Sequence, residues 1–186
     1  VATNPEKTLH DLEKFDLLLV PKPTEPFTDA QKQVVDQYIM NGGRALWLID
    51  NVAVSLEDMY KTGGMTMAMP VNLNLTDMFF QYGFRINYTL VNDLYFSEII
   101  VATGDGSQTR YMPIPWVYNP LVISGNNHLI NNHLDAVRFQ FANSIDTLKN
   151  GVKKTVLLAS SPFSKADGTP REINLRFDPN NQNKEA

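Results

Sequence analysis

The sequence contains serine, histidine and aspartate residues from which a hydrolytic triad could be assembled. The nucleophile would be Ser160 or Ser124, the base His128 or His133, and the orienting acid Asp50. Ser124 lacks the G-x-S-x-G turn that exposes a nucleophile, and Ser160 is followed by Ser-Pro, a poor start for the helix after such a turn. We therefore expect no enzyme, and a hydrolase acting on a carbohydrate or an ester is kept as an alternative function.

The residues that could bind a metal ion also give only weak evidence for a site. The chain has no cysteine, which excludes cysteine-ligated zinc and iron–sulfur sites. His128 and His133 are five residues apart, a spacing that places them on different faces of a helix, and no zinc-binding helix motif surrounds them. We expect solvated loop histidines, no metal site and no cofactor.

Methionines are concentrated between residues 59 and 69. Their soft thioethers could bind Cu(I), but methionine also provides an adaptable apolar contact surface. We consider contact with a partner the better interpretation. The predicted partner-docking residues are Met65, Met67, Met69, Trp116 and Tyr118.

The elements that must position these residues start with a strand–helix–strand unit. Phe15–Val20 and Ala45–Ile49 are short apolar runs that predict strands buried on both faces. Between them, Thr28 and Gln31 form a capping box for a helix that ends at Asn41-Gly42-Gly43. Two such strands joined by a crossover helix pair in parallel, with right-handed connectivity.

Open parallel sheets bind ligands beyond the carboxyl ends of their strands. Asp50 ends the second strand, and another predicted strand, Thr155–Ala159, is followed directly by two serines. A small-ligand receptor is therefore an alternative function, although an aspartate after a strand more often accepts local backbone N–H bonds. The candidate ligand-binding residues are Thr24, Asp50, Asn51, Ser160 and Ser161.

The remaining segments predict shorter elements. We expect a long loop over Asn51–Asn74 with a helical turn near Ser55–Tyr60, and a helix over Leu73–Tyr82. Strands are predicted at Phe84–Val91, at Val137–Phe141 and near Arg171–Phe177, with a hairpin over Glu98–Pro113 that turns at Gly104–Ser107.

Composition excludes several classes of protein. The 186 residues are 43% hydrophobic, enough for one core, and the net charge of −4 with no basic stripe argues against nucleic-acid binding. No apolar run reaches the roughly 20 residues of a membrane helix, and no signal peptide opens the chain. These features alone would equally suit a cytoplasmic protein.

The segments PKPTEPF (Pro21–Phe27), LTDMFFQYGF (Leu75–Phe84), VRFQFANSIDTL (Val137–Leu148) and LLASSPF (Leu157–Phe163) carry a family resemblance. Together with the strand–helix–strand unit, they resemble the GldG-type auxiliary component of Bacteroidetes ABC transporters associated with gliding motility. The resemblance implies a non-catalytic, extracytoplasmic (periplasmic) domain at the inner membrane, with its membrane anchors in segments outside this chain. It implies the permease and the ATPase of the transporter as partners, and it names no catalytic residue.

The predicted fold class is therefore α/β, with a mainly parallel sheet, helices on both faces in a flavodoxin-like or amidotransferase-like layout, and an antiparallel hairpin or edge extension. We expect a single domain over residues 1–179 and a disordered tail over residues 180–186. The predicted function is the binding of protein partners or of an envelope ligand.

Overall fold

The structure is a computed structural model that describes residues 4–103, 109–126 and 128–175. The chain divides into two compact units, each with its own hydrophobic core. Whether they form the single domain predicted over residues 1–179 stays a prediction, and the predicted tail at 180–186 lies outside the described residues. Unit 1 comprises Val1–Asn51, Val71–Asn87 and Ile145–Lys154, and unit 2 comprises Val52–Pro70, Tyr88–Ser144 and Thr155–Ala186.

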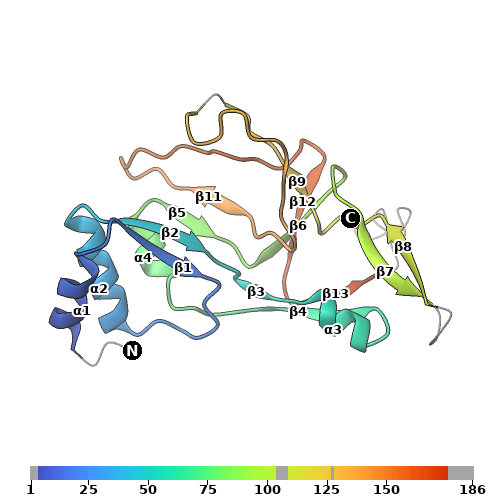
Figure 1. The fold of residues 1–186 in the computed structure, drawn as a ribbon, viewed down its shortest axis with the longest axis horizontal. Helices are drawn as coiled ribbons and strands as arrows, with labels where there is room; N and C mark the ends of the chain where they lie inside the picture. The colour runs from blue at the N-terminus through green and yellow to red at the C-terminus, as the bar shows by residue number, and fades with distance from the viewer. Residues whose placement is uncertain (1–3, 104–108, 127, 176–186) are drawn as a thin grey trace. The chain divides into compact units, whose positions relative to one another are not determined.

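The centre of unit 1 is the strand–helix–strand segment. β1 (Leu17–Pro21) and β2 (Arg44–Leu48) pair in parallel, and α2 (Asp29–Met40) connects them (Figure 1). The Thr28 hydroxyl accepts the backbone N–H of Gln31 at 3.2 Å, and the Gln31 carboxamide oxygen accepts the backbone N–H of Thr28 at 2.8 Å. The predicted parallel pairing and the predicted capping box are both confirmed.

Tyr38 fixes the end of α2 against the starts of both strands. Its side chain is 2% exposed, and its hydroxyl donates to the carbonyl of Phe15, just before β1, at 2.8 Å. A Cβ atom on Gly43, just before β2, would lie 2.4 Å from the Tyr38 ring. Glycine is therefore required at position 43 for packing, whereas Gly42 supplies the positive φ (+98°) that ends the helix.

One face of the β1–β2 pair is exposed, so the prediction that both strands are buried on both faces is wrong. Exposure alternates along each strand, and the opposite face contributes Trp47 to the core of unit 1. Continuous apolar runs predict double burial only where a second layer covers the sheet. The four exposed side chains, which we call the leucine face, are Leu17 (54% exposed), Leu19 (50%), Leu46 (47%) and Leu48 (50%).

Aromatic rings fill the core of unit 1. The Trp47 ring meets the edge of Phe79 at a centroid distance of 5.2 Å and lies 6.0 Å from Phe27. Phe79 stacks on Phe84 at 4.8 Å. Such pairs stabilise a core by about 0.5–1.5 kcal/mol beyond area burial. This ring cluster joins β2 to α4 (Thr76–Gln81), the helix predicted over Leu73–Tyr82.

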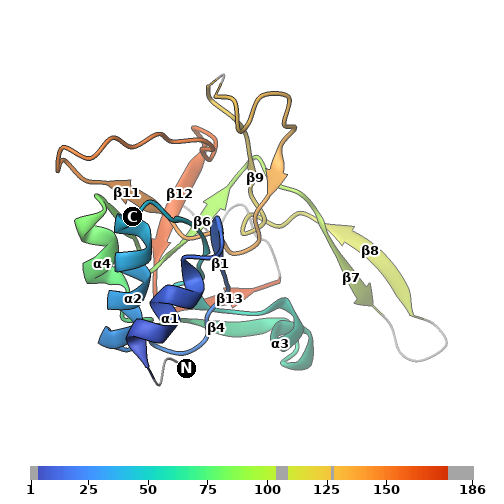
Figure 2. The same cartoon turned by 60° about the vertical axis from the view of Figure 1, so that its left-hand side comes forward.

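Three further contacts hold unit 1 together. α1 (Pro5–Leu12) lies against α2, and β5 (Phe84–Ile86) pairs antiparallel with β11 (Ile145–Thr147). Figure 2 shows α2 beside α4, where the Lys32 ammonium lies 2.7 Å from the Asp77 carboxylate. This ion pair connects two helices through residues that are 45 positions apart in sequence.

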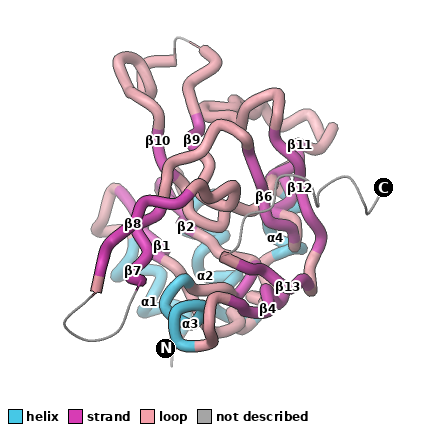
Figure 3. The backbone as a smooth tube through the Cα atoms, turned by 90° about the vertical axis from the view of Figure 1, so that its right-hand side faces the viewer, coloured by secondary structure: helices cyan, strands magenta, loops and turns pink. Residues whose placement is uncertain are grey.

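Unit 2 is built from small antiparallel sheets. In one, β4 (Met65–Pro70) lies between β3 (Val52–Ala53) and β13 (Arg171–Asn174). In another, β6 (Thr89–Asp93) pairs with β12 (Ser164–Gly168), as Figure 3 shows. These pairings bring the last described strands onto segments 71 to 109 residues earlier in the chain, from Ser164 opposite Asp93 to Asn174 opposite Met65.

The other elements of unit 2 are shorter. The predicted hairpin is present as β7 (Ile99–Thr103) and β8 (Arg110–Ile114), and its predicted turn at 104–107 lies outside the described residues. β9 (Leu121–Val122) pairs with β10 (Val137–Arg138). α3 (Leu56–Lys61) begins after Ser55, whose hydroxyl accepts the backbone N–H of Glu57, and it matches the predicted helical turn.

The predicted fold class is wrong. Among the described residues, β1–β2 is the one parallel pair, and every other strand pair is antiparallel. Parallel strands need a crossover of a dozen or more residues. β7 and β8 are separated only by residues 104–109, and they pair antiparallel. In the part of the chain that the structure describes, only the first crossover produces a parallel pair, so helices do not cover both faces of a larger sheet.

Three local predictions also need correction. The segment predicted as a loop, Asn51–Asn74, contains the strands β3 and β4. The predicted strand Thr155–Ala159 does not form, and Ala159 makes only an isolated bridge to Ile123. The predicted strand Phe84–Val91 is interrupted before β6. In each case the residue types of the segment did not indicate whether another strand would lie beside it to form hydrogen bonds.

We expect Gly43→Ala to lower the free energy of unfolding by about 1–3 kcal/mol, because the added methyl group must displace the Tyr38 ring. Urea denaturation followed by circular dichroism measures this change. Gly125→Ala is the control: a Cβ there meets no atom within 4 Å, so we expect a change of about 0.5 kcal/mol or less. Equal effects of the two substitutions would contradict the packing role of Gly43.

The hydrogen bond from Lys32 lowers the pKa of Asp77 below its usual value, and the same bond raises the pKa of Lys32. A lowered carboxyl pKa stabilises the fold above the unfolded pKa, and this stabilisation is lost as pH falls through the folded value. Asp77→Asn should therefore reduce stability at about pH 6, with the difference from wild type shrinking below about pH 4. Denaturation across this range tests it. In a Lys32→Met background the same substitution should show a smaller pH dependence, because the backbone N–H groups of Asp77 and Met78 still lower the carboxyl pKa.

Candidate functional site

The predicted ligand-binding residues are divided between the two units. Thr24, Asp50 and Asn51 belong to unit 1, whereas Ser160 and Ser161 belong to unit 2. The structure therefore does not bring all five together within one compact unit, and a common ligand site stays a prediction. The strand that was expected to place the serines beside Asp50 is also absent.

At the carboxyl ends of β1 and β2, Asp50 pairs with a lysine that the sequence patterns did not single out. The ammonium of Lys22 lies 3.0 Å from the Asp50 carboxylate, and both side chains are exposed, at 73% and 46%. Lys22 adopts a φ of +43° and donates its backbone N–H to the carbonyl of Leu48 at 2.7 Å. An exposed pair of this kind contributes about 0–1 kcal/mol to stability, so its main effect is to set the charge pattern at the strand ends.

The neighbouring Asn51 has a structural role. Its side chain is buried and donates to the carbonyl of Ile86 at 3.0 Å, and its own carbonyl accepts the backbone N–H of Val71 at 2.8 Å. These bonds connect the end of β2 with β5. Thr24, in contrast, is an exposed residue of the loop before α2.

In unit 2, Ser161 bonds to a buried aspartate that the sequence did not single out. Asp93 is fully buried at the end of β6 and accepts backbone N–H bonds from Ser161 at 2.7 Å and from Tyr95 at 2.8 Å. The Ser161 hydroxyl also donates to this carboxylate. Together these donors stabilise a buried charge, and they join the segment before β12 to β6.

A second buried carboxylate, Asp167 on β12, is surrounded by donors. Asn92 donates its amide at 2.5 Å and Tyr118 its hydroxyl at 3.1 Å, and the Arg171 guanidinium lies 3.4 Å away. Burial, together with the charge of Asp167, raises the pKa of Tyr118 to about 12. The phenol therefore stays protonated and keeps donating at neutral pH, so the cluster acts as a polar part of the core.

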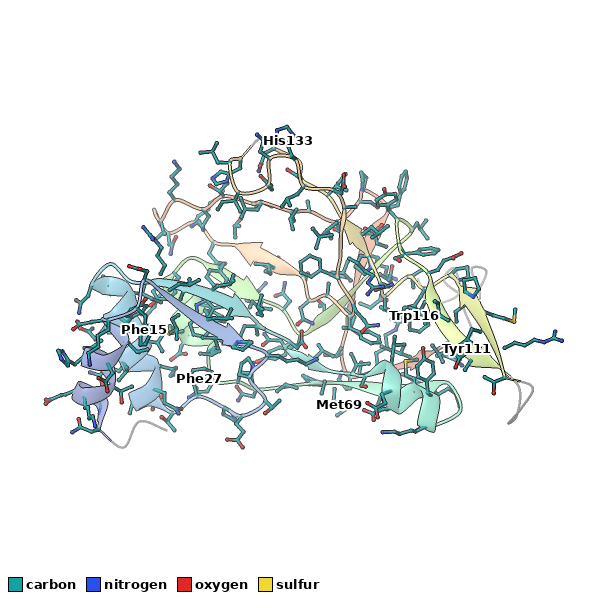
Figure 4. The ribbon with its side chains drawn as sticks, viewed as in Figure 1. Phe15, Phe27, Met69, Tyr111, Trp116 and His133 are labelled. Atoms are coloured by element: carbon teal, nitrogen blue, oxygen red, sulfur yellow. The ribbon has the colours of Figure 1, made fainter. Side chains whose placement is uncertain are left out.

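The methionines predicted for partner docking occupy alternate positions of β4. Met65, Met67 and Met69 are 46%, 49% and 47% exposed, and we call these three side chains the methionine face; Figure 4 labels Met69. The intervening Ala68 is fully buried. Across the strand pair, Glu172 lies opposite Met67. The strand thus presents three thioethers in one row.

The aromatic residues predicted for docking lie elsewhere. Trp116 and Tyr118 are 1% and 8% exposed and belong to the core of unit 2. Their rings meet edge to face at a centroid distance of 5.6 Å, and Trp116 also meets Phe141 at 6.5 Å. These two side chains pack the core and are not presented to a partner.

Ser124, Ser160 and His128 of the hypothetical triad bond to residues close to them in sequence. The Ser124 hydroxyl donates to the carbonyl of Asn126 at 2.6 Å, and the Ser160 hydroxyl lies 2.8 Å from that of Ser164. His128 accepts the backbone N–H of Ile130 through Nδ1 at 3.3 Å. His133 lies in the loop between β9 and β10 (Figure 4). These contacts stabilise the local chain and do not bring a serine, a histidine and an aspartate together.

Two kinds of feature are relevant among the described residues, a cluster of metal ligands and a membrane-spanning helix. No group of three or more histidine, aspartate or glutamate side chains there is placed to hold a metal ion. No described helix combines the length and apolar composition needed to cross a membrane.

Comparison with known proteins identifies a family. No curated protein and no solved structure matched the chain. A family model described as "ABC-type uncharacterized transport system" matches all of residues 1–186. This match supports an accessory role in an ABC transport system. The chain therefore belongs to this family of auxiliary components of ABC transport systems.

Proposed function

We propose that this chain is a non-catalytic, extracytoplasmic domain of the auxiliary subunit and that it binds another protein of the same transporter. Family membership supports the accessory role. The gliding-motility type, the periplasmic location and an anchor in segments outside this chain rest on the sequence resemblance. The observation that carries the binding role is the methionine face of β4.

The methionine face suits the binding of an apolar protein segment. Alternate residues of a strand lie about 6.7 Å apart on one face, so the three thioethers span roughly 13 Å. β4 is held by neighbouring strands on both edges, so the side chains adapt while the backbone does not. Methionine is unbranched and polarizable, and it is frequent on surfaces that accept varied apolar partners.

Within the proposed location, the permease is the partner that fits best. An extracytoplasmic domain can contact the loops of a permease that emerge on the same side of the membrane, whereas an ATPase acts on the cytoplasmic side. We therefore propose direct contact with an apolar extracytoplasmic segment of the permease. The ATPase would join the same complex through the permease.

The contacts of the hydroxyl groups favour binding over catalysis. Ser161 donates to a buried carboxylate, and Ser160 and Ser124 bond within their own loops. The triad would need a histidine base within hydrogen-bond reach of its serine, and Ser124 and Ser160 bond instead to a carbonyl and to a second hydroxyl. This pattern supports the non-catalytic proposal.

Replacing the three methionines by threonine should weaken recovery of the permease with the full-length subunit. Threonine keeps the β propensity of the strand and removes most of the apolar side chain. Loss of one half-buried methionine contact costs about 1 kcal/mol, roughly fivefold in affinity. The measurement is co-purification of permease and ATPase from membranes with wild type, Met67→Thr and the triple variant.

The control is Met112→Thr, because Met112 is a similarly exposed (51%) methionine on a different strand, β8. It should leave recovery unchanged. If the triple variant recovers the permease as well as wild type does, the methionine face is not the docking surface. If wild type recovers no transporter subunit, the proposed binding role itself is wrong.

A further inference from the structure

The leucine face requires a cover. Its four leucines are each about half exposed and occupy adjacent positions on two paired strands, with Leu19 directly opposite Leu46. Parallel strands are almost always covered on both faces, and contiguous exposed apolar patches mark interaction sites. These considerations are independent of the methionine face and of the proposed function.

The charges at the two ends of this face suggest what covers it. Arg44 is exposed at the start of β2, and Asp50 follows the end of the strand. Alternation along β2 places Arg44, Leu46 and Leu48 on the same face, and continuing it reaches Asp50. Read in the reverse direction, the pattern basic–leucine–leucine–acidic becomes acidic–leucine–leucine–basic, so this row is complementary to itself.

We propose that a second copy of this chain packs on the leucine face, related to the first by a two-fold axis that passes near Trp47. In this arrangement the β2 strands of the two copies face each other and run in opposite directions. Leu46 of each copy meets Leu48 of the other, and Arg44 of each copy meets Asp50 of the other. A two-fold interface uses the same patch twice, and it requires this kind of self-complementarity.

The existing partner of Asp50 is compatible with this contact. Lys22 occupies one carboxylate oxygen, Oδ2, at 3.0 Å, and a carboxylate accepts several donors. An arginine from the second copy would add a charge-assisted bond at the rim, where it fixes register. The leucines would provide the apolar centre of the interface.

The test is sedimentation equilibrium of the chain over a range of concentrations. Wild type should show a reversible dimer. Leu46→Glu, which places a carboxylate in the apolar centre, should raise the dimer dissociation constant at least about tenfold. The matched control is Leu129→Glu, because Leu129 is 90% exposed and lies outside the leucine face; it should leave the dissociation constant unchanged.

A charge exchange separates this interface from a simple loss of folding. Arg44→Asp and Asp50→Arg should each weaken the dimer, because each places like charges opposite one another. The double variant R44D/D50R should restore the dissociation constant to within about threefold of wild type. A contact within one copy cannot explain such a recovery, because residues 44 and 50 of the same copy lie roughly 20 Å apart along an extended segment.

Three results would overturn the proposal. One is a wild-type chain that stays monomeric at the highest concentration, which would mean that something else covers the face. The second is a dimer that Leu46→Glu leaves intact. The third is a double charge variant that is weaker than both single variants.

Discussion

The packing of Tyr38 against Gly43 is the constraint on which the first unit depends. The ring occupies the space that a Cβ at position 43 would need, and the hydroxyl bonds to the carbonyl of Phe15. One side chain of α2 thereby positions the chain just before β1 and just before β2. Because the starts of the two strands are fixed together, they pair in parallel with Leu17 opposite Arg44. That register determines which leucines share the exposed face and places Trp47 in the aromatic core.

How far the sequence predicted the fold depended on how local the signals were. The capping box at Thr28, the helical period of α2 and the Asn-Gly-Gly end are all short-range, and each is confirmed. The remaining sheets depend on partners up to 109 residues away, as for Asn174 and Met65, and composition does not encode such pairings. β4 was missed for a specific reason. It exposes its methionines and buries Thr66 in part and Ala68 completely, so its apolar alternation is inverted relative to an ordinary strand.

In the candidate sites, too, features set by local sequence could be predicted and features set by distant pairings could not. The position of Asp50 after β2 could be predicted from a local pattern, whereas its partner Lys22 could not, because proline residues on both sides indicated only a turn. Asp93 and Asp167 were missed because no local pattern distinguishes a buried aspartate from one in a solvated loop. Their burial results from the pairing of β6 with β12, which brings Asn92 and Ser161 to the two carboxylates. Trp116 and Tyr118 were assigned to the surface because an aromatic cluster in sequence does not reveal on which side of a sheet it lies.

The two exposed faces differ in the chemistry of their side chains, and this difference bears on what each can recognise. The leucine face combines branched side chains on two paired strands with opposite charges at its ends, so it suits one fixed and oriented partner surface. The methionine face has unbranched, polarizable side chains on a single strand, with Glu172 as a charged cross-strand neighbour, so it suits apolar segments of varied shape. A chain that places rows of exposed apolar groups on regular strands loses solubility unless these faces are covered. An accessory component of a transport system has a physical reason to keep such faces, because its role is performed through contacts with other proteins.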